Sequence, residues 1–482
     1  MNTTGEVCYS RSMVEHKVLY RFRIDADARA ALEKLPSCIQ EANPVPERKR
    51  GALRFEIRDL WRALTMERSH RNIDYLNSPA FFSAYLRYFL PWNLVRLTAL
   101  LSDLPLSLDP HATIVDIGAG PLTFAIALYC AKPELRKTPL NILCADRAPR
   151  IMEAGKLILE ILAAKHGGEL PPWEISLKRA KFGEPLSSKA NLVVGANVFN
   201  EFFWKHEGML ADEAADLYRK LKHYCEPSGS MLIVEPGEPR SGSLMSALRA
   251  AAIFQGDKVR APCPHSRACP MPGIFRSGQE HLTEAPRQTQ DHQRSGTAAG
   301  ERTGKHQSLV RVRMPSIRTK YPWCHFSIDA SFAPKWLTRL SEEAGLAKEK
   351  LSFSFLYVTR DDAAERGPDT HLTRNTLDRY ERARDSAETQ YRIVSDTISL
   401  PGNRLGRYAC GPGGYTLITS PAREKLPESG SLVSLRDTAA DDAPPRGRAD
   451  SRRETHAETA EQHPVPPSPE YDQKSGAILI SY

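Results

Sequence analysis

The sequence lacks any apolar run long enough to cross a membrane. Its most apolar stretch, Ile114–Ala131, is interrupted by Asp116 and by a Gly-Ala-Gly-Pro turn, so it is better explained as a strand, a loop and a helix. The N-terminus has no apolar signal-peptide core, and Glu6 and Glu15 argue against an acid-free transit peptide. We therefore expect no membrane partner and a cytoplasmic, bacterial-type protein, with a mitochondrial address left open.

Apolar residues are scarce for a globular chain. They make up 41% of the 482 residues, and the mean hydropathy of −0.43 indicates polar segments attached to a folded core. The nine cysteines are expected to be buried thiols or metal ligands in a reducing compartment, and disulfides are not expected. The net charge of +8 favours anionic partners such as RNA without proving one, and no DNA partner is expected.

The N-terminal part, residues 1–110, has the periodicity of helices. Ile57, Leu60 and Leu64 lie on one face of an amphipathic helix. A second helical stretch, 81–101, must kink or break at Pro91. Its aromatic stripe could stack on RNA bases, but such stripes are more often core packing.

Residues 111–360 alternate short apolar runs with helical stretches, which predicts an α/β core with a parallel sheet covered by helices. The expected strands are 113–117, 141–145, 191–196, 230–235 and 352–359, and the expected helices are 122–131, 150–165, 211–224, 242–254 and 334–344.

The rest of the chain is predicted from composition. The interval 256–333 is expected to be irregular, and its polar middle, about 274–320, to be a disordered insertion. Short strands at 391–400, 407–409 and 414–419 predict a small β module over 385–423, and a disordered tail is expected over 424–482.

A glycine loop follows the first expected strand. The run Asp-Ile-Gly-Ala-Gly-Pro, residues 116–121, leads into a helix expected to start near Pro121. Glycines let the backbone approach a bulky ligand, and a helix N-terminus offers unpaired N–H groups. Asp146 ends the next strand, where an acid can accept hydrogen bonds from ribose hydroxyls. The loop lacks the third glycine of the NAD and FAD motif and has the form typical of class I methyltransferases, so S-adenosylmethionine is expected at Asp116, Gly118, Ala119, Gly120 and Asp146.

Polar residues also follow the expected strand 191–196. Asn197 and Asn200 are expected to contact the cofactor, and Asn200 and Glu201 fall where methyltransferases place residues facing the transferable methyl. Capping of the next helix explains Asn200 and Glu201 equally well. The sequence offers no Asn-Pro-Pro-Tyr motif and no nucleophilic cysteine with a general base, so the catalytic residues are unknown.

Four cysteines in the second half are candidate metal ligands. Cys263 and Cys269 lie in Cys-Pro-His-Ser-Arg-Ala-Cys-Pro, Cys324 lies in Trp-Cys-His-Phe, and Cys410 lies in the late β module. Four thiolates can close a tetrahedral zinc site or hold a [4Fe–4S] cluster, and the spacing alone favours neither. The other cysteines are expected to be ordinary buried thiols: Cys8, Cys38, Cys130, Cys144 and Cys225.

The order of these motifs resembles that of one known family. Glu-Pro-Gly-Glu-Pro at 235–239, Ala-Pro-Cys-Pro-His at 261–265, Cys-Pro-Met at 269–271 and Trp-Cys-His-Phe-Ser at 323–327 resemble the methyltransferase-like proteins of the mitochondrial small ribosomal subunit and their bacterial relatives. The resemblance spans about 75–420. It implies a Rossmann-like class I methyltransferase core with an N-terminal helical region and a small C-terminal β module. It also implies S-adenosylmethionine binding, assembly with the small ribosomal subunit and its rRNA in translation, and a [4Fe–4S] cluster, with zinc as the alternative, on Cys263, Cys269, Cys324 and Cys410.

One departure concerns the link between the second and third cysteines. It is short in the relatives, whereas about fifty residues intervene here. The entropic cost of closing a loop grows only logarithmically with its length, so the site can survive the insertion. Two functions stay open: an rRNA methyltransferase, and a non-catalytic ribosome assembly factor that uses the fold and the metal cluster as an RNA-docking scaffold. A zinc-stapled methyltransferase of small molecules is a weaker third.

Overall fold

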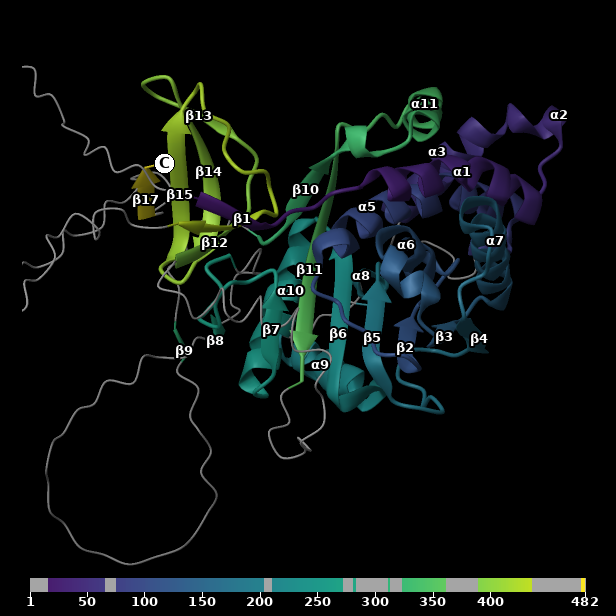
Figure 1. Cartoon of the computed structure of the whole chain (residues 1–482), viewed down its shortest axis with the longest axis horizontal. Helices are drawn as coiled ribbons and strands as arrows, with labels where there is room; N and C mark the ends of the chain where they lie inside the picture. The colour runs from purple at the N-terminus through teal and green to yellow at the C-terminus, as the bar shows by residue number, and fades with distance from the viewer. Residues whose placement is uncertain are drawn as a thin grey trace, which may run out of the picture.

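The computed structural model describes residues 16–65, 75–202, 210–271, 281–282, 311–312, 323–360, 389–435 and 478–481. Within this part, a large sheet with helices lies beside a smaller β module, which is on the left in Figure 1. None of the helices in these ranges is long and apolar enough to span a membrane.

The large sheet is mainly parallel. Its path is β10-β11-β6-β5-β2-β3-β4, in which neighbours from β6 to β4 are parallel and β11 is antiparallel to β6. The chain leaves β2 in one direction for β3 and β4 and returns to its other side for β5 and β6. The carboxyl ends of β2, β3 and β5 therefore meet where the strand order reverses, which is where open α/β sheets bind ligands. The strands are β2 (Ala112–Ile117), β3 (Leu140–Asp146), β4 (Trp173–Arg179), β5 (Ala190–Ala196), β6 (Cys225–Pro236) and β11 (Lys350–Thr359).

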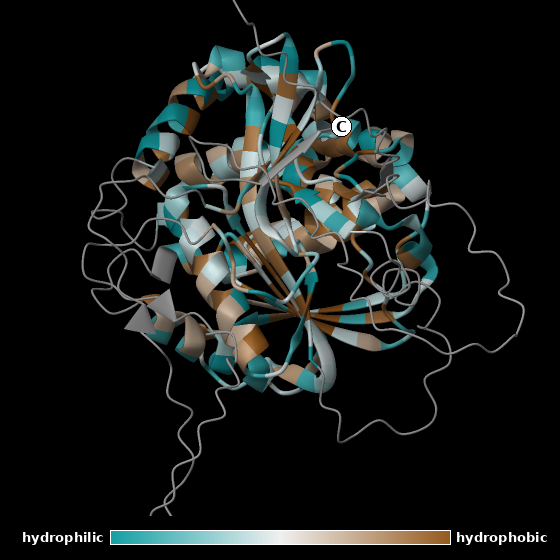
Figure 2. Cartoon of the chain, turned by 90° about the vertical axis from the view of Figure 1, so that its left-hand side faces the viewer, coloured by the Kyte–Doolittle hydropathy of each residue, from teal (hydrophilic) through white to brown (hydrophobic). Residues whose placement is uncertain are grey.

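Both faces of this sheet are covered by helices. Along β2, Ile114 packs into one core and Val115 into the other. The first core includes helices α1 (Ala26–Ala42), α5 (Leu90–Asp103), α6 (Thr123–Ala131) and α7 (Pro149–Gly167), and the second includes α9 (Leu210–Tyr224) and α10 (Pro239–Phe254). Figure 2 shows the apolar colour concentrated on the central strands. Burial on both faces explains why these strands are nearly continuous apolar runs in the sequence.

The predicted break near Pro91 is confirmed. A π-helical turn, Tyr85–Phe89, interrupts the helix before α5, and the Leu90 N–H reaches back to the Tyr85 carbonyl. Pro91 has no N–H for the carbonyl of Arg87, so a regular α-helix cannot continue through it. The aromatic stripe of this stretch is buried or partly buried in the core, which confirms the packing explanation. The other helices are α2 (Glu47–Arg50), α3 (Leu53–Thr65), α4 (Pro79–Ala84), α8 (Phe199–Phe202) and α11 (Lys335–Glu343), with 3-10 turns at Tyr75–Asn77, Pro133–Lys137 and Ala330–Phe332.

The edge of the large sheet beyond β11 consists of two separate strands. β7 (Lys258–Ala261) pairs with one end of β11 and β10 (Phe326–Asp329) with the other. The prediction that 256–333 is irregular is therefore wrong at both ends of that interval. Each of these strands is four residues long and, in the described structure, pairs with β11. Such short strands leave little alternation in the sequence from which they could be predicted. The segment between them, 262–325, carries three of the four candidate cysteines.

Both ends of the chain contribute to the β module. β1 (His16–Tyr20) pairs antiparallel with β16 (Leu432–Leu435), which corrects the expectation of a purely helical residue range 1–110 and of a tail disordered from residue 424. The predicted strand 391–400 is divided in two. The remaining strands are β12 (Thr389–Ile393), β13 (Ile398–Leu400), β14 (Arg404–Gly411), β15 (Gly414–Pro421) and β17 (Ile478–Ser481).

The predicted insertion at 274–320 lies mostly outside the described residues. Within it, β8 (His281–Leu282) pairs with β9 (Arg311–Val312). Most of the tail after residue 435 also lies outside the described ranges.

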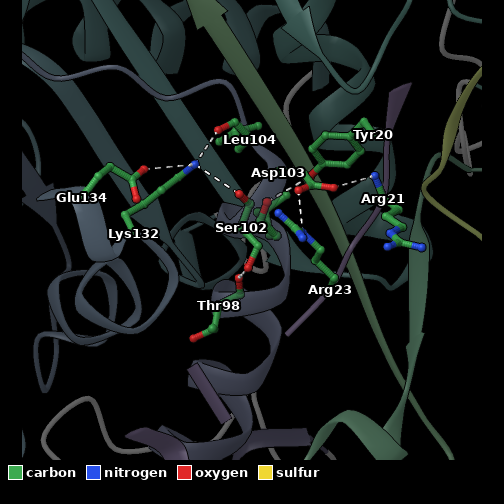
Figure 3. A network of polar contacts seen from close by, with 10 residues as sticks. Tyr20, Arg21, Arg23, Thr98, Ser102, Asp103, Leu104, Lys132 and Glu134 are labelled. Atoms are coloured by element: carbon green, nitrogen blue, oxygen red, sulfur yellow. Dashed lines mark hydrogen bonds and ion pairs between the residues drawn. The ribbon is translucent and has the colours of Figure 1, made fainter. Parts of the chain in front are cut away.

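The chain that leaves β1 is fastened to the helical layer (Figure 3). The Tyr20 hydroxyl donates to the Leu100 carbonyl over 3.0 Å, and Arg23 Nε donates to the Asp103 carboxylate over 2.7 Å. Both acceptor residues lie in the last turn of α5. Helix carbonyls there, such as that of Leu100, lack intrahelical partners. These bonds tie the first strand of the β module to the core.

Helix α7 passes very close to the glycine loop. A Cβ atom on Gly155 would lie 2.2 Å from the Pro121 carbonyl carbon. We expect Gly155→Ala to lower the free energy of unfolding by about 1–3 kcal/mol, because the helix or the loop must shift. Denaturant unfolding checks this against Gly51→Ala, where a Cβ meets nothing within 4 Å. Equal stability of the two variants would contradict this packing.

Candidate functional site

The glycine loop lies at the carboxyl ends of β2, β3 and β5. Gly118 and Gly120 have left-handed φ values of +67° and +51°. The Gly118 N–H donates to the Ala145 carbonyl over 2.8 Å, which ties the loop to β3. A Cβ atom on Gly118 would lie 2.4 Å from Val198 Cγ2. Glycine is therefore required both by the turn and by the approach of the segment after β5.

The helix after the loop begins later than predicted. Leu122 has a left-handed φ of 54° and caps α6, which starts at Thr123. Pro121 lies in the turn before the helix, which therefore begins two residues after the expected start near Pro121. Ala119 remains in the loop, where its N–H donates to the Ala145 carbonyl over 3.2 Å.

Asp146 fixes the loop from the end of β3. One carboxylate oxygen accepts the Gly120 N–H over 3.0 Å, and the other accepts the Ala148 N–H over 2.9 Å. Each carboxylate oxygen has a second lone pair. The residue therefore orders the glycine loop and the start of α7 and keeps acceptor capacity for a ligand.

Asp116 lies beneath this loop and is 1% exposed. Burial, assisted by the nearby Asp146 carboxylate, raises the pKa of Asp116 well above its ordinary value. Its Oδ2 atom is buried without a hydrogen-bond partner in the described structure. Asp116 is thus placed as a buried carboxyl that favours its neutral form.

This raised pKa predicts a pH-dependent gain from Asp116→Asn in the cofactor-free protein. When folding raises the pKa of a carboxyl, the folded protein becomes less stable as the pH rises from the unfolded pKa of that carboxyl, 3.8 here, towards its folded pKa. We expect the variant to unfold at a higher temperature than the wild type at pH 7, with a difference that shrinks as the pH falls towards 4. Thermal unfolding across this range measures it, and a difference that does not change with pH would contradict the prediction.

Glu235 anchors the segment that follows β5. Its carboxylate is fully buried and accepts three backbone N–H groups, from Val198 (3.1 Å), Phe199 (2.7 Å) and Asn200 (3.2 Å). Charge-assisted bonds of this kind are the stronger class of hydrogen bond. In the sequence, Glu235 is distinguished only as part of the Glu-Pro-Gly-Glu-Pro motif. An acid that ends a buried strand beside another strand terminus is the signal that could have identified it.

Asn197 and Asn200 are both brought to this edge of the sheet. Asn197 has a left-handed φ of 58°, and its N–H donates to the Val234 carbonyl over 2.7 Å. Its Oδ1 atom is buried and has no hydrogen-bond partner among the described residues. Glu235, and not Asn200, caps the N-terminus of α8 through its side chain, while the side chain of Glu201 lies outside those described.

The four candidate cysteines share one region, in which Cys410 is buried and the other three are partly buried. Burial raises the pKa of Cys324 well above its ordinary value, and the thiols of Cys263, Cys269 and Cys410 raise it further. Cys410 is raised in the same way by burial and by Cys263 and Cys269. The thiols that follow β7, the thiol that precedes β10 and the thiol on β14 are therefore close enough to interact electrostatically. In the described ranges, no group of three or more His, Cys, Asp or Glu residues is arranged to hold a metal ion.

Hydrogen bonds join the cysteine segment to the β module. Arg392 is 1% exposed on β12, and its Nε donates to the Pro262 carbonyl over 2.7 Å. Arg267 donates in the opposite direction, to the Pro412 carbonyl over 2.8 Å. His265 Nε2 lies 3.2 Å from Cys410 Sγ. The module therefore packs directly on the segment that carries the cysteines.

Two of the four motifs on which the family resemblance rests also meet in space. Trp323 Nε1 donates to the Gly237 carbonyl over 3.0 Å, and the indole stacks on the His325 ring with centroids 4.9 Å apart. This contact joins Glu-Pro-Gly-Glu-Pro to Trp-Cys-His-Phe. The remaining described cysteines are buried free thiols, as predicted, whereas Cys8 lies outside the described residues: Cys38, Cys130, Cys144 and Cys225.

The strand order, the final antiparallel strand and the glycine loop define the class of the core. They form a mixed α/β, Rossmann-like fold of the class I methyltransferase type.

Residues 83–277 match the family described as mitochondrial small ribosomal subunit Rsm22. The match covers less than half of the chain, and it includes the glycine loop and two of the four cysteines, Cys263 and Cys269. No curated protein matches the chain.

The chain is similar to solved methyltransferase-type structures over about a third of its length. It is 16% identical to a precorrin-6y C5,15-methyltransferase from Geobacter metallireducens, covering 35% of this chain and 75% of that one with a TM-score of 0.24. It is 18% identical to a ribosomal protein L11 methylase from Lactobacillus delbrueckii, covering 34% and 70% with a TM-score of 0.24. It is also 18% identical to a cyclopropane synthase from Mycobacterium tuberculosis, covering 34% and 46% with a TM-score of 0.20, so it spans less than half of that protein.

Proposed function

We propose that this chain is an S-adenosylmethionine-binding, methyltransferase-like protein that acts on, or assembles with, the rRNA of the small ribosomal subunit. The observation that carries the proposal is the family match over 83–277, which runs through the glycine loop and into the cysteine segment. The family's name places it in mitochondria, so it supports the mitochondrial address that the sequence leaves open rather than the expected cytoplasmic one.

Residues at the carboxyl edge of the sheet fit this cofactor. The turn at Gly118 and Gly120 gives the backbone room to approach it, and Asp146 keeps lone pairs that can accept ribose hydroxyls. The buried Oδ1 of Asn197 is an unused acceptor beside the loop, suited to a donor group of the cofactor. When bound, S-adenosylmethionine supplies an activated methyl group. The chain's own contribution is to hold it against the ordered segment after β5.

The second part of the proposal is a metal centre on Cys263, Cys269, Cys324 and Cys410. Four neighbouring thiols, one buried and three partly buried, are a soft ligand set, suited to a [4Fe–4S] cluster or to zinc. A zinc ion, with Zn–S bonds of about 2.3 Å, would draw the sulfur atoms to within about 4 Å of one another. A four-iron cluster joins thiolates that stand further apart. The family resemblance of the cysteine motifs leads us to propose the cluster first, with zinc as the alternative.

Incubation with precursor small subunits and methyl-labelled S-adenosylmethionine tests catalysis. An rRNA methyltransferase incorporates label into the RNA of wild-type incubations and not in incubations with Asp146→Ala. Binding of the cofactor without any incorporation would contradict turnover on this substrate.

The hydrogen bonds between the cysteine segment and the β module favour a second candidate, a non-catalytic assembly factor. In that role the metal centre would stabilise an RNA-docking scaffold, and cofactor chemistry would be dispensable. Asp116→Ala should then leave subunit maturation intact, and Cys263→Ser should impair it. The reverse pattern would exclude the scaffold.

A further inference from the structure

A buried arginine of α10 is bonded to the cysteine segment. Arg249 is 3% exposed, and its Nε donates to Cys263 Sγ over 3.0 Å. Its Nη2 donates to the carbonyls of His265 and Arg267, both over 2.7 Å. One guanidinium thus holds a candidate ligand atom and the backbone of the turn that follows it.

The same face of α10 contacts the other cysteine motifs on this side of the site. Gly242, Ser246 and Arg249 are spaced by four and three residues, which places them on one side of a helix. Ser246 lies close enough to Cys269 to lower the pKa of its thiol, against the larger effect of burial, which raises it. Trp323, next to Cys324 in the sequence, packs so closely on Gly242 that a Cβ there would lie 2.6 Å from its ring. A single helical face therefore orders the segments of three candidate ligands.

The side chains near the positive charge of Arg249 include the thiols of candidate ligands. In the described structure its guanidinium donates to one thiol and two carbonyls, and the ionisable side chains that influence it are those of Cys263, Cys269 and Cys410. A buried cation is costly unless it is paired. Four thiolates around either Zn²⁺ or a [4Fe–4S]²⁺ cluster leave a net charge of about −2, which this cation partly compensates.

We propose that Arg249 is the positioning residue of the four-cysteine metal centre. It holds the Cys263 sulfur and the 263–267 turn in the ligating arrangement and compensates the charge of the thiolates. This inference rests on the proposed metal centre. It assigns to α10 a role that does not depend on which metal is bound.

The test uses the full-length protein purified without oxygen, as wild type, Arg249→Met and Arg249→Lys. Arg240→Met is the matched control, because it removes an exposed arginine from the same helix. Release of the bound metal to a chelator is timed, and circular dichroism reports whether each variant is folded. Partners of metal ligands typically contribute about 10- to 100-fold to affinity. We expect metal release from Arg249→Met to be faster by about that factor, with Arg249→Lys in between and Arg240→Met unchanged.

A second readout separates positioning from general destabilisation. If iron is bound, loss of the N–H···S bond and of the positive charge should favour the oxidised cluster by about tenfold, a fall of about 59 mV in the reduction potential. Partial recovery in Arg249→Lys identifies the charge as the cause. For a zinc-bound protein, the same partial recovery of the release rate serves this purpose.

The outcomes distinguish this inference from the proposed function. A wild type that binds no metal overturns this inference and the metal centre of the proposed function, but not the proposed S-adenosylmethionine binding. A wild type that binds metal, with Arg249→Met releasing it at the wild-type rate, overturns only the role of Arg249. Unfolding of Arg249→Met together with wild-type behaviour of Arg249→Lys would also contradict it, because lysine cannot bond the sulfur and both carbonyls in the planar geometry of arginine.

Discussion

Replacement of Asp146 by alanine is expected to weaken S-adenosylmethionine binding by about 100-fold, or roughly 3 kcal/mol. The variant loses the carboxylate that accepts the N–H groups of Gly120 and Ala148, so the loop is released and the acceptor for the ribose hydroxyls is lost together. Isothermal titration calorimetry measures the effect directly.

Two variants make this titration specific. Glu153→Ala removes an exposed carboxylate from the first turns of α7 and should leave the affinity unchanged. Asp146→Asn keeps the size of the side chain and should fall between alanine and the wild type. Wild-type affinity in Asp146→Ala would show that the cofactor, if bound, does not use this loop.

Replacement of Cys263 by serine is expected to remove the metal and to loosen the β module. Metal that binds only the folded arrangement contributes to folding stability, by about 2.7 kcal/mol when it is present at 100 times its dissociation constant. Cys410 lies on β14 and Cys263 follows β7. The loss of stability should therefore be greatest where the β module and the core meet. We expect metal content to fall at least about tenfold and amide hydrogen exchange in β12 and β14 to rise by about 100-fold.

Cys38→Ala is the control for this change. It removes a fully buried thiol of α1 that belongs to the core and not to the cysteine group, so the metal content per folded chain should stay at the wild-type value. If Cys263→Ser loses the metal without any change of amide exchange in β12 and β14, that result would contradict the role of the metal centre in holding the β module against the core.

The centre of the fold could be predicted from sequence because local pattern and burial agree there. β2, β3, β5 and β6 are buried on both faces, so each is a nearly continuous apolar run between helices. The glycine loop could be located for a related reason, since its backbone angles and its contact with Val198 both require glycine. The edge strand β4 was missed because its exposure alternates and its apolar signal is weak.

What the sequence did not reveal depends on contacts between distant segments. β7 and β10 are each defined by pairing with β11, and β1 by pairing with β16 more than 400 residues away. Likewise, Glu235 and Arg249 are ordinary residue types whose roles appear only once their partners are known. The cysteines could be chosen by motif, but spacing alone could not place Cys410 beside them.

Metal analysis of the protein purified without oxygen tests most directly whether four distant cysteines form one metal centre in a methyltransferase-type core. We expect a brown protein with about four iron and four acid-labile sulfide atoms per chain, and loss of both in Cys324→Ser. A colourless wild-type protein without iron would contradict the cluster, and one that also lacks zinc would contradict the centre itself.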